Sequence, residues 1–331
     1  MDTNCRKIRL LEQADKAYFL DCVDELYATI EQDASFEVNR AEVRYSRQKN
    51  MLVRLLSKFA GLQRLRPGSG GSRTLNFASM ISGDFKLFLP YAFLTRHNYI
   101  YMYDVWPRFH KWIFPLLDYF NIRVVFFSSK QVFEDHQLKY PQSKCESMWL
   151  PEAIKADDYR FESYANKDID VLEFGRIYQA YHDRIAGVLQ QQNRHHVYRK
   201  AGATLLFPDK NAFVNGLARA KVTICVPSNI THPDRAEYIS TMTLRYLQAM
   251  ASKVLIVGVM PSDMNELFPY TPIVEIDMAH AAKQLTDVLD NYEQHIPLIE
   301  RNYLEVVNNH QWQNRWVVMK AKMEDSLCNR P

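Results

Sequence analysis

The sequence predicts an α/β protein with two domains, each built around a parallel sheet that carries helices on its faces. Short β-branched runs alternate with segments of helical spacing along most of the chain, and this alternation is typical of such sheets. It comes in two series, which a polar stretch without apolar periodicity separates at residues 155–160. A chain of 331 residues is also too long for one ordinary core and about right for two domains.

The first series follows a less regular N-terminal stretch. Helical spacing predicts helices at 18–30 and 51–65, and the second of these ends at a flexible loop, residues 67–72. The elements expected next are strand 74–78, helix 84–94, strand 99–103, helix 109–120, strand 124–127, helix 130–138 and a strand near Met148. We therefore expect an N-terminal domain over residues 1–155 and an interdomain linker over 156–167.

The second series predicts another Rossmann-like half. Its expected elements are strand 169–174, helix 178–189, strand 203–207, helix 212–218, strand 222–226, helix 240–252, strand 254–258, helix 264–268, strand 273–276, helix 281–289 and a long helix 298–324. Asp209 follows Pro208 and is expected to start the second of these helices. We expect a C-terminal domain over 168–300, and a helical tail over 301–331 that packs towards the N-terminal domain. Two such domains would enclose a cleft, where ligands commonly bind.

The composition excludes several classes of protein. With 47% hydrophobic and 24% charged residues the chain reads as an ordinary globular protein, and a net charge of +3 is too small to imply a nucleic-acid partner. Five scattered cysteines fit neither a disulfide framework nor a zinc site and suggest a reducing cytoplasm. We expect no signal peptide, and no run reaches the roughly 18 apolar residues that span a bilayer. Any membrane association would be peripheral.

The most informative stretch runs from Val222 to Glu266 and reads as strand, loop, helix and strand. Ligands of parallel sheets bind at the carboxyl ends of the strands, where a loop opens into the N-terminus of a helix. The unpaired N–H groups of that helix can bind an anion such as phosphate. The polar side chains that this loop provides are Ser228, Asn229, Thr231, His232, Ser240 and Thr241.

Several short motifs in the C-terminal half occur in a familiar order. They are Phe-Gly-Arg at 174–176, Phe-Pro-Asp at 207–209, Val-Pro-Ser at 226–228, Leu-Gln-Ala-Met-Ala at 247–251, Val-Leu-Ile-Val-Gly at 254–258 and Glu-Leu-Phe at 266–268, with Trp-Leu-Pro-Glu-Ala at 149–153 before them. In these motifs the chain resembles glycosyltransferases of the GT-B fold, which has two Rossmann-like domains facing across a cleft and a C-terminal helix folding back. The resembling group is the large retaining one called glycosyl transferases group 1 or family 4. The resemblance covers about 169–289, and the first hundred residues hardly at all.

The resemblance implies a hexosyltransferase-type enzyme that uses a nucleotide diphosphate sugar and a glycan or lipid-linked acceptor. It also implies retention of anomeric configuration, no bound metal or other cofactor, and a place in surface polysaccharide or glycoconjugate synthesis. The chain departs from the family pattern where two glutamates are expected, because Ser240 and Gln248 stand there. A catalytically silent GT-B relative that binds nucleotide sugar or glycan as a scaffold is therefore the main alternative. An epimerase or phosphorylase is a weaker one.

Ten residues are candidates for binding the donor or for catalysis on the donor side. They are Arg176, Ser228, His232, Ser240, Thr241, Met242, Thr243, Arg245, Gln248 and Glu266. Arg176 could bind the diphosphate leaving group, whose negative charge a metal-free site must stabilise, or it could pair with Asp183 or Glu173. Arg245 could do the same or pair with Glu237 or Glu266. The hydroxyl groups could merely cap the helix, His232 could simply be exposed, and Glu266 could cap its own helix.

The acceptor side is expected from the N-terminal half, where Asp104 and His110 are the catalytic candidates. Asp104 could deprotonate an acceptor hydroxyl and Trp106 could stack on a sugar, although Asp104 could equally be a helix cap. Glu152 is a weaker candidate. Residues 47–66 form a basic amphipathic segment, which could lie on an anionic membrane at the inner face or pack in the core with solvated charges.

Overall fold

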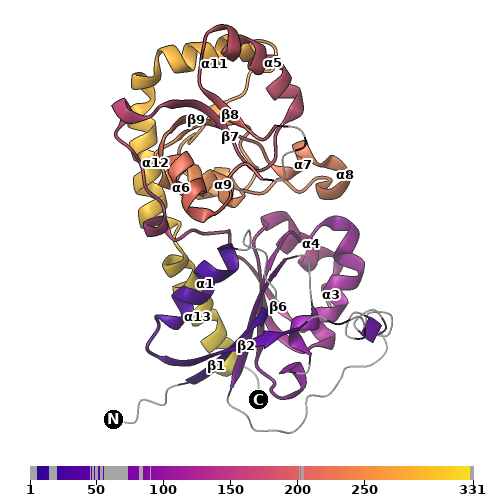
Figure 1. Ribbon diagram of the computed structural model, residues 1–331. Coiled ribbons are helices and arrows are strands. Elements are labelled where there is room, and N and C mark those ends of the chain that lie inside the picture. The colour runs from indigo at the N-terminus through magenta and orange to yellow at the C-terminus, as the bar shows by residue number, and fades with distance from the viewer. Residues whose placement is uncertain are drawn as a thin grey trace. The chain divides into compact units, whose positions relative to one another are not determined.

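The chain forms two compact units, which are described separately. The computed structural model describes residues 6–14, 21–44, 74–81, 85–89, 91–200, 202 and 205–328, together with residues 46, 48, 51, 52 and 55. Unit 1 comprises Met1–Pro151 and Trp312–Pro331, and unit 2 comprises Glu152–Gln311. Each unit has its own parallel sheet with helices around it, which confirms the predicted fold class (Figure 1).

The sheet of unit 1 has six strands in the order β2-β1-β3-β4-β5-β6, all paired in parallel. The strands are β1 (Arg6–Gln13), β2 (Phe36–Val43), β3 (Leu75–Ile81), β4 (Asn98–Tyr103), β5 (Ile122–Phe127) and β6 (Glu146–Trp149). Every residue of β4 is buried, as expected of a central strand with helices on both faces. The four strands predicted between residues 74 and 149 are confirmed.

The first two strands were not predicted. β2 is an edge strand in which the residues between Phe36 and Val43 are exposed or half-buried, so it shows no apolar run. Its charges pair with those of β1 instead, as Lys7 does with Glu37 at 3.1 Å. Edge strands commonly carry such charges because one side of the strand faces solvent. The apolar signal that identifies buried strands is therefore weak here.

The helices of unit 1 are α1 (Asp21–Glu31), α3 (His110–Tyr119), α4 (Lys130–Lys139) and α13 (Trp312–Cys328), with 3₁₀ turns η2 (Phe85–Phe88), η3 (Tyr91–Phe93) and η4 (Pro107–Phe109). The helix predicted over 84–94 is wrong, because η2 and η3 stand in its place. Pro90 has no N–H to donate, which disfavours a continuous helix in this segment. Phe85 still reaches the core, where its ring stacks on Phe120 at 5.4 Å.

The amphipathic segment 47–66 lies outside the described residues except for residues 48, 51, 52 and 55. Met51, Leu52 and Leu55 are exposed. Across the ranges that the structure describes, no helix is long and apolar enough to cross a bilayer.

The sheet of unit 2 has five strands in the order β11-β10-β9-β7-β8, again all parallel. They are β7 (Ile169–Glu173), β8 (His196–Tyr198), β9 (Ala220–Cys225), β10 (Leu255–Gly258) and β11 (Val274–Glu275). The strand predicted over 203–207 is wrong for residues 205–207, which form an irregular segment, and β8 takes the edge instead. Leu206 and Phe207 are apolar because they pack against the core from this loop.

Helices cover both faces of this sheet. They are α5 (Gln179–Gln191), α6 (Lys210–Ala218), α7 (Ser228–Thr231), α8 (Pro233–Ala236), α9 (Leu244–Ala251), α10 (Met264–Leu267), α11 (Ala281–Asp290) and α12 (Ile296–Asn309). One core cluster packs α5 and α11 on the sheet, and another packs α6, α9 and the end of α12. Asp209 caps α6 as predicted, because its Oδ1 accepts the N–H of Ala212 at 2.8 Å.

The single C-terminal helix predicted over 298–324 is two helices, α12 in unit 2 and α13 in unit 1. The helix is interrupted at His310 and Gln311, where the backbone pairs with another segment. Ile154 donates its N–H to the carbonyl of His310 at 3.1 Å, and Ile154 forms an isolated parallel β-bridge with Gln311. α13 packs on unit 1 through Trp312, whose ring lies 5.5 Å from that of Tyr101.

Candidate functional site

The topology of unit 2 locates a candidate site at the carboxyl ends of β7 and β9. These strands are neighbours, but the chain leaves β7 for β8 on one side and β9 for β10 on the other. In doubly wound sheets ligands bind at such a switch point. β7 runs into Gly175 and Arg176, while β9 runs into Val226 and then Ser228, the first residue of α7.

A buried arginine joins the two strand ends. Arg245, in the first turn of α9, donates to the carbonyl of Arg176 at 3.1 Å and to that of Val226 at 2.7 Å. Its close approach also explains Gly175, which has φ +70° and where a Cβ would lie 3.0 Å from Cδ of Arg245. Arg245 is only 9% exposed, and in the described part of the chain no carboxylate lies within ion-pairing distance of it. The acids considered as its partners, Glu237 and Glu266, are therefore not paired with it.

Arg176 is half-buried and donates from its guanidinium to Oγ of the buried Ser228. Neither acid considered as its alternative partner takes that place. Asp183 accepts from Gln179, and Glu173 is bonded to two histidines. Two of the donor-binding candidates, Arg176 and Ser228, are thus in direct contact at the switch point.

His232 is exposed, and its Nδ1 lies 3.0 Å from Oγ1 of Thr231. Partial loss of solvent around the ring lowers the pKa of His232, and the positive charges of Arg176, Arg235 and Arg245 lower this pKa further. The arginines are therefore close enough to act on one imidazole. Such a positive field favours an anionic ligand over a cationic one.

Two carboxylates bind the chain at the start of α9. Asp263 accepts the N–H of Met242 at 2.8 Å and the hydroxyl of Thr241 at 2.6 Å, and Glu152 accepts the N–H of Leu244 at 3.0 Å. The N–H of Met242, expected to hold phosphate, is therefore occupied by Asp263 in this structure. Thr243 has a buried Oγ1 without a hydrogen-bond partner among the described residues.

The remaining donor-side candidates lie around this helix. Gln248 donates from Nε2 to the hydroxyl of Tyr159 at 3.0 Å. Oγ of Ser240 accepts the N–H of Ser262 at 3.3 Å, which ties Ser240 to the loop after β10. Glu266 is exposed on the short helix α10. The two positions that depart from the family pattern, Ser240 and Gln248, thus form hydrogen bonds within unit 2.

Of the acceptor-side candidates, Asp104, His110 and Trp106 lie in unit 1, and Glu152 lies in unit 2. Asp104 follows β4 with a left-handed backbone, φ 49°. His110 is buried: its Nε2 lies 3.2 Å from the carbonyl of Val105, its Nδ1 lies 3.2 Å from Asp135, and its ring stacks on Phe114. This environment favours a structural role for His110.

Two further acceptor-side residues are also buried. Trp106 is 2% exposed, so its ring presents little surface to a sugar. Glu152 is 7% exposed and caps α9, so it contributes to the start of that helix.

Comparison with solved structures identifies the architecture. Similar structures include sucrose-phosphate synthase from Thermosynechococcus elongatus (12% identity, TM-score 0.61, covering 98% of this chain and 100% of that chain). A glycosyltransferase from Rickettsia africae (10%, 0.57, 99% and 100%) and HepE from Anabaena in complex with UDP and glucose (10%, 0.55, 96% and 99%) are also similar. The chain has the GT-B fold. No family model matches the sequence, and no curated protein matches it.

The GT-B resemblance did not identify Asp263, because this residue is far in sequence from the helix that it holds. What distinguishes Asp263 from other acids is that its side chain is buried, and the sequence alone does not show which acids are buried. Asp263 is 3% exposed, and burial raises its pKa from 3.8 to about 6, against the lowering effect of the bonds from Thr241 and Met242.

Because of this raised pKa, we expect Asp263 to make the stability of the protein depend on pH. Between about pH 4 and pH 6 the folded state holds a proton that the unfolded state releases, so the free energy of unfolding falls as pH rises through this window. We expect Asp263→Asn, which keeps an acceptor for Met242, to remove about 2–3 kcal/mol of this fall. Urea unfolding of both proteins at several pH values measures the difference. If the free energy of unfolding changed with pH in the same way for both proteins, the prediction would be wrong.

Proposed function

We propose that this protein is a glycosyltransferase that moves a hexose from a nucleotide diphosphate sugar to a glycan or lipid-linked acceptor. The observation that carries the proposal is Arg245, a buried cation without a carboxylate partner in the described part of the chain, at the switch point of unit 2. A buried charge needs an opposite charge or strong hydrogen bonds. Two carbonyls bind the guanidinium, and an anionic ligand would complete its environment.

The chemistry of sugar transfer explains why arginines suit this place. The diphosphate gains negative charge as the bond to the sugar breaks, and fixed positive groups stabilise it there. Arg176 presents a guanidinium fork that matches phosphate oxygens, and Ser228 holds one of its nitrogens. HepE, of similar fold, was crystallised with UDP and with UDP-glucose, which supports a nucleotide sugar as the ligand here.

The proposal extends to retention of anomeric configuration and to departure of the diphosphate without a metal ion. Both are carried over from the GT-B group that the motifs resemble. We also propose that the enzyme contributes to surface polysaccharide or glycoconjugate synthesis, with a peripheral contact between residues 47–66 and anionic lipid. Analysis of the anomer formed from a defined donor, with and without EDTA, tests the first two points.

Arg176→Ala tests the donor site. We expect the Kd for UDP or another nucleoside diphosphate to rise about 10–100-fold, because charge-assisted hydrogen bonds to phosphate are lost. Isothermal titration calorimetry measures this change. Arg219→Ala is the matched control, since Arg219 pairs with Asp168 at the opposite, amino end of the same sheet.

If wild type and Arg176→Ala bound the nucleoside diphosphate with equal affinity, the assignment of the donor site to Arg176 would be wrong. Donor hydrolysis or transfer by the purified protein tests the enzymatic part separately. Tight nucleotide binding without turnover of any donor would instead support the scaffold alternative.

A further inference from the structure

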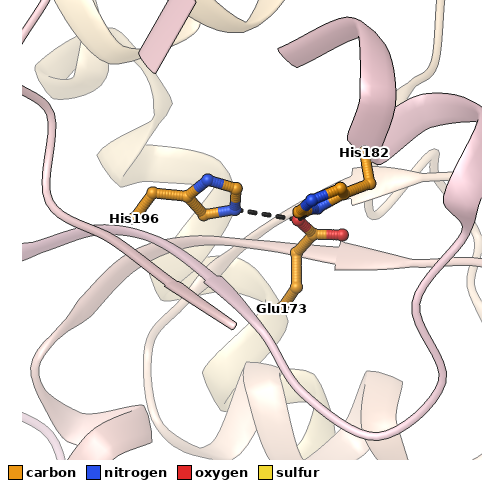
Figure 2. Close-up of side chains that lie close together, drawn as sticks. All are labelled: Glu173, His182 and His196. Carbon is orange, nitrogen blue, oxygen red and sulfur yellow. Dashed lines mark hydrogen bonds and ion pairs between the residues drawn. The ribbon is translucent and has the colours of Figure 1, made fainter. Parts of the chain in front are cut away.

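Three side chains of unit 2 that the proposed reaction does not use converge beside the end of β7. Glu173 ends β7, His182 lies in the first turn of α5 and His196 begins β8. Both imidazoles meet one oxygen: Nδ1 of His182 is 2.6 Å and Nε2 of His196 is 2.8 Å from Oε1 of Glu173. Figure 2 shows the two rings directed at the carboxylate from different elements. The three possible ligand atoms lie within 4.8 Å of one another.

The carboxylate of Glu173 lacks a permanent counter-charge. Its side chain is 2% exposed, and the two histidines are its ion-pair partners among the described residues. Its second oxygen, Oε2, is buried and accepts no hydrogen bond in the part of the chain that the structure describes. A buried carboxylate needs a cation and further hydrogen bonds to offset the loss of water. An imidazole provides a positive charge only when it is protonated, whereas a bound metal ion provides one permanently.

We propose that Glu173, His182 and His196 bind a divalent transition-metal ion of the zinc class. Two imidazoles and a carboxylate are a known zinc ligand set, and they leave a fourth position for water. The nitrogen ligands also disfavour magnesium and calcium, which prefer oxygen.

Binding requires the three ligand atoms to rearrange around the ion. Tetrahedral ligands at about 2.0–2.1 Å from zinc lie roughly 3.3 Å apart, so both imidazole nitrogens, now 2.6 and 2.8 Å from Oε1 of Glu173, must move away from this oxygen to admit the ion. The ring of Tyr198 supports both imidazoles, with its centroid 4.6 Å from each of theirs. His182 and His196 stay 12% and 7% exposed, which leaves a route for an ion.

The ion would connect three elements at the edge of the sheet. β8 has only three residues, all half-buried, and it is joined to the rest of the sheet on one side. A metal bound to His196, His182 and Glu173 would fix this short strand and the start of α5 against β7. This ion would be separate from the arginines of the donor site.

Metal binding by the full-length, untagged protein tests the proposal directly. After removal of metal with EDTA, equilibrium dialysis against ZnCl₂ is expected to give one ion per chain. Glu173→Gln and His196→Ala should weaken binding by about 100-fold, since each removes one of three ligands. His280→Ala is the matched control, because His280 is an exposed histidine that pairs with Asp277 outside this cluster, and it should bind as wild type does.

Wild-type protein that binds no stoichiometric zinc would overturn the proposal. So would zinc binding that Glu173→Gln and His196→Ala leave unchanged. If these variants do not fold, the visible spectrum of the wild-type protein with CoCl₂ decides. Nitrogen and oxygen ligands give d–d bands alone, whereas a thiolate charge-transfer band would assign the ion to a cysteine and overturn the proposal.

Discussion

Gly258→Ala is expected to destabilise the protein by about 3 kcal/mol or more, because the new methyl group has no space. Gly258 ends β10, and a Cβ there would lie 1.9 Å from the carbonyl oxygen of Cys225 and 2.9 Å from its carbonyl carbon. Both atoms are backbone of the neighbouring strand β9, so no side chain can move aside. The same oxygen accepts the N–H of Val259 at 3.0 Å, which holds the two strand ends together.

Gly187→Ala is the matched control for this prediction. Gly187 lies in α5, where no heavy atom would come within 4 Å of the new Cβ. Alanine favours the helix over glycine by roughly 1 kcal/mol, so this variant should be as stable as wild type or more so. Urea unfolding followed by circular dichroism compares the two. Equal midpoints for Gly187→Ala and Gly258→Ala would show that β9 and β10 can separate at no cost.

The sequence predicted the regular interior of the fold better than its edges. Buried parallel strands such as β4 and β9 are rich in aromatic and β-branched residues, which a reader of the sequence can recognise. The edge strands β2 and β8 carry polar residues and have no such run. Residues 205–207 were wrongly predicted as a strand for the opposite reason. Leu206 and Phe207 are apolar because they reach the core from a loop.

The candidate site shows the same limit. Arg176 and Ser228 were found because each follows an apolar strand within a short motif, and these strands are neighbours in the sheet. Asp263 and the Glu173 cluster depend on contacts between distant parts of the chain. His196, for example, is 23 residues from Glu173, and no local motif spacing suggests that they meet. Asp263 and Glu173 stand out because their carboxylates are buried, and burial is known only once the chain is folded.

Arg245→Met is expected to raise the Kd for a nucleoside diphosphate by about 100-fold or more. The substitution removes a charge from the site and leaves the carbonyls of Arg176 and Val226 without their donor. Each such carbonyl costs about 1–3 kcal/mol if it stays buried and unpaired, so we also expect a lower free energy of unfolding. Arg245→Lys is the conservative comparison. It keeps the charge but cannot reproduce the guanidinium fork, and should fall between wild type and Arg245→Met.

A double-mutant cycle distinguishes positioning from a separate contact with the ligand. Arg245 holds the backbone of Arg176, so loss of Arg245 should also displace the Arg176 side chain from the phosphates. The Arg176→Ala and Arg245→Met effects on nucleoside diphosphate affinity should then be less than additive, by about 0.5 kcal/mol or more. Calorimetry of the two single variants and the double variant measures the coupling. Fully additive losses of affinity would mean that each arginine acts on the ligand independently. The hydrogen bonds by which Arg245 joins the ends of β7 and β9 would then contribute to stability only.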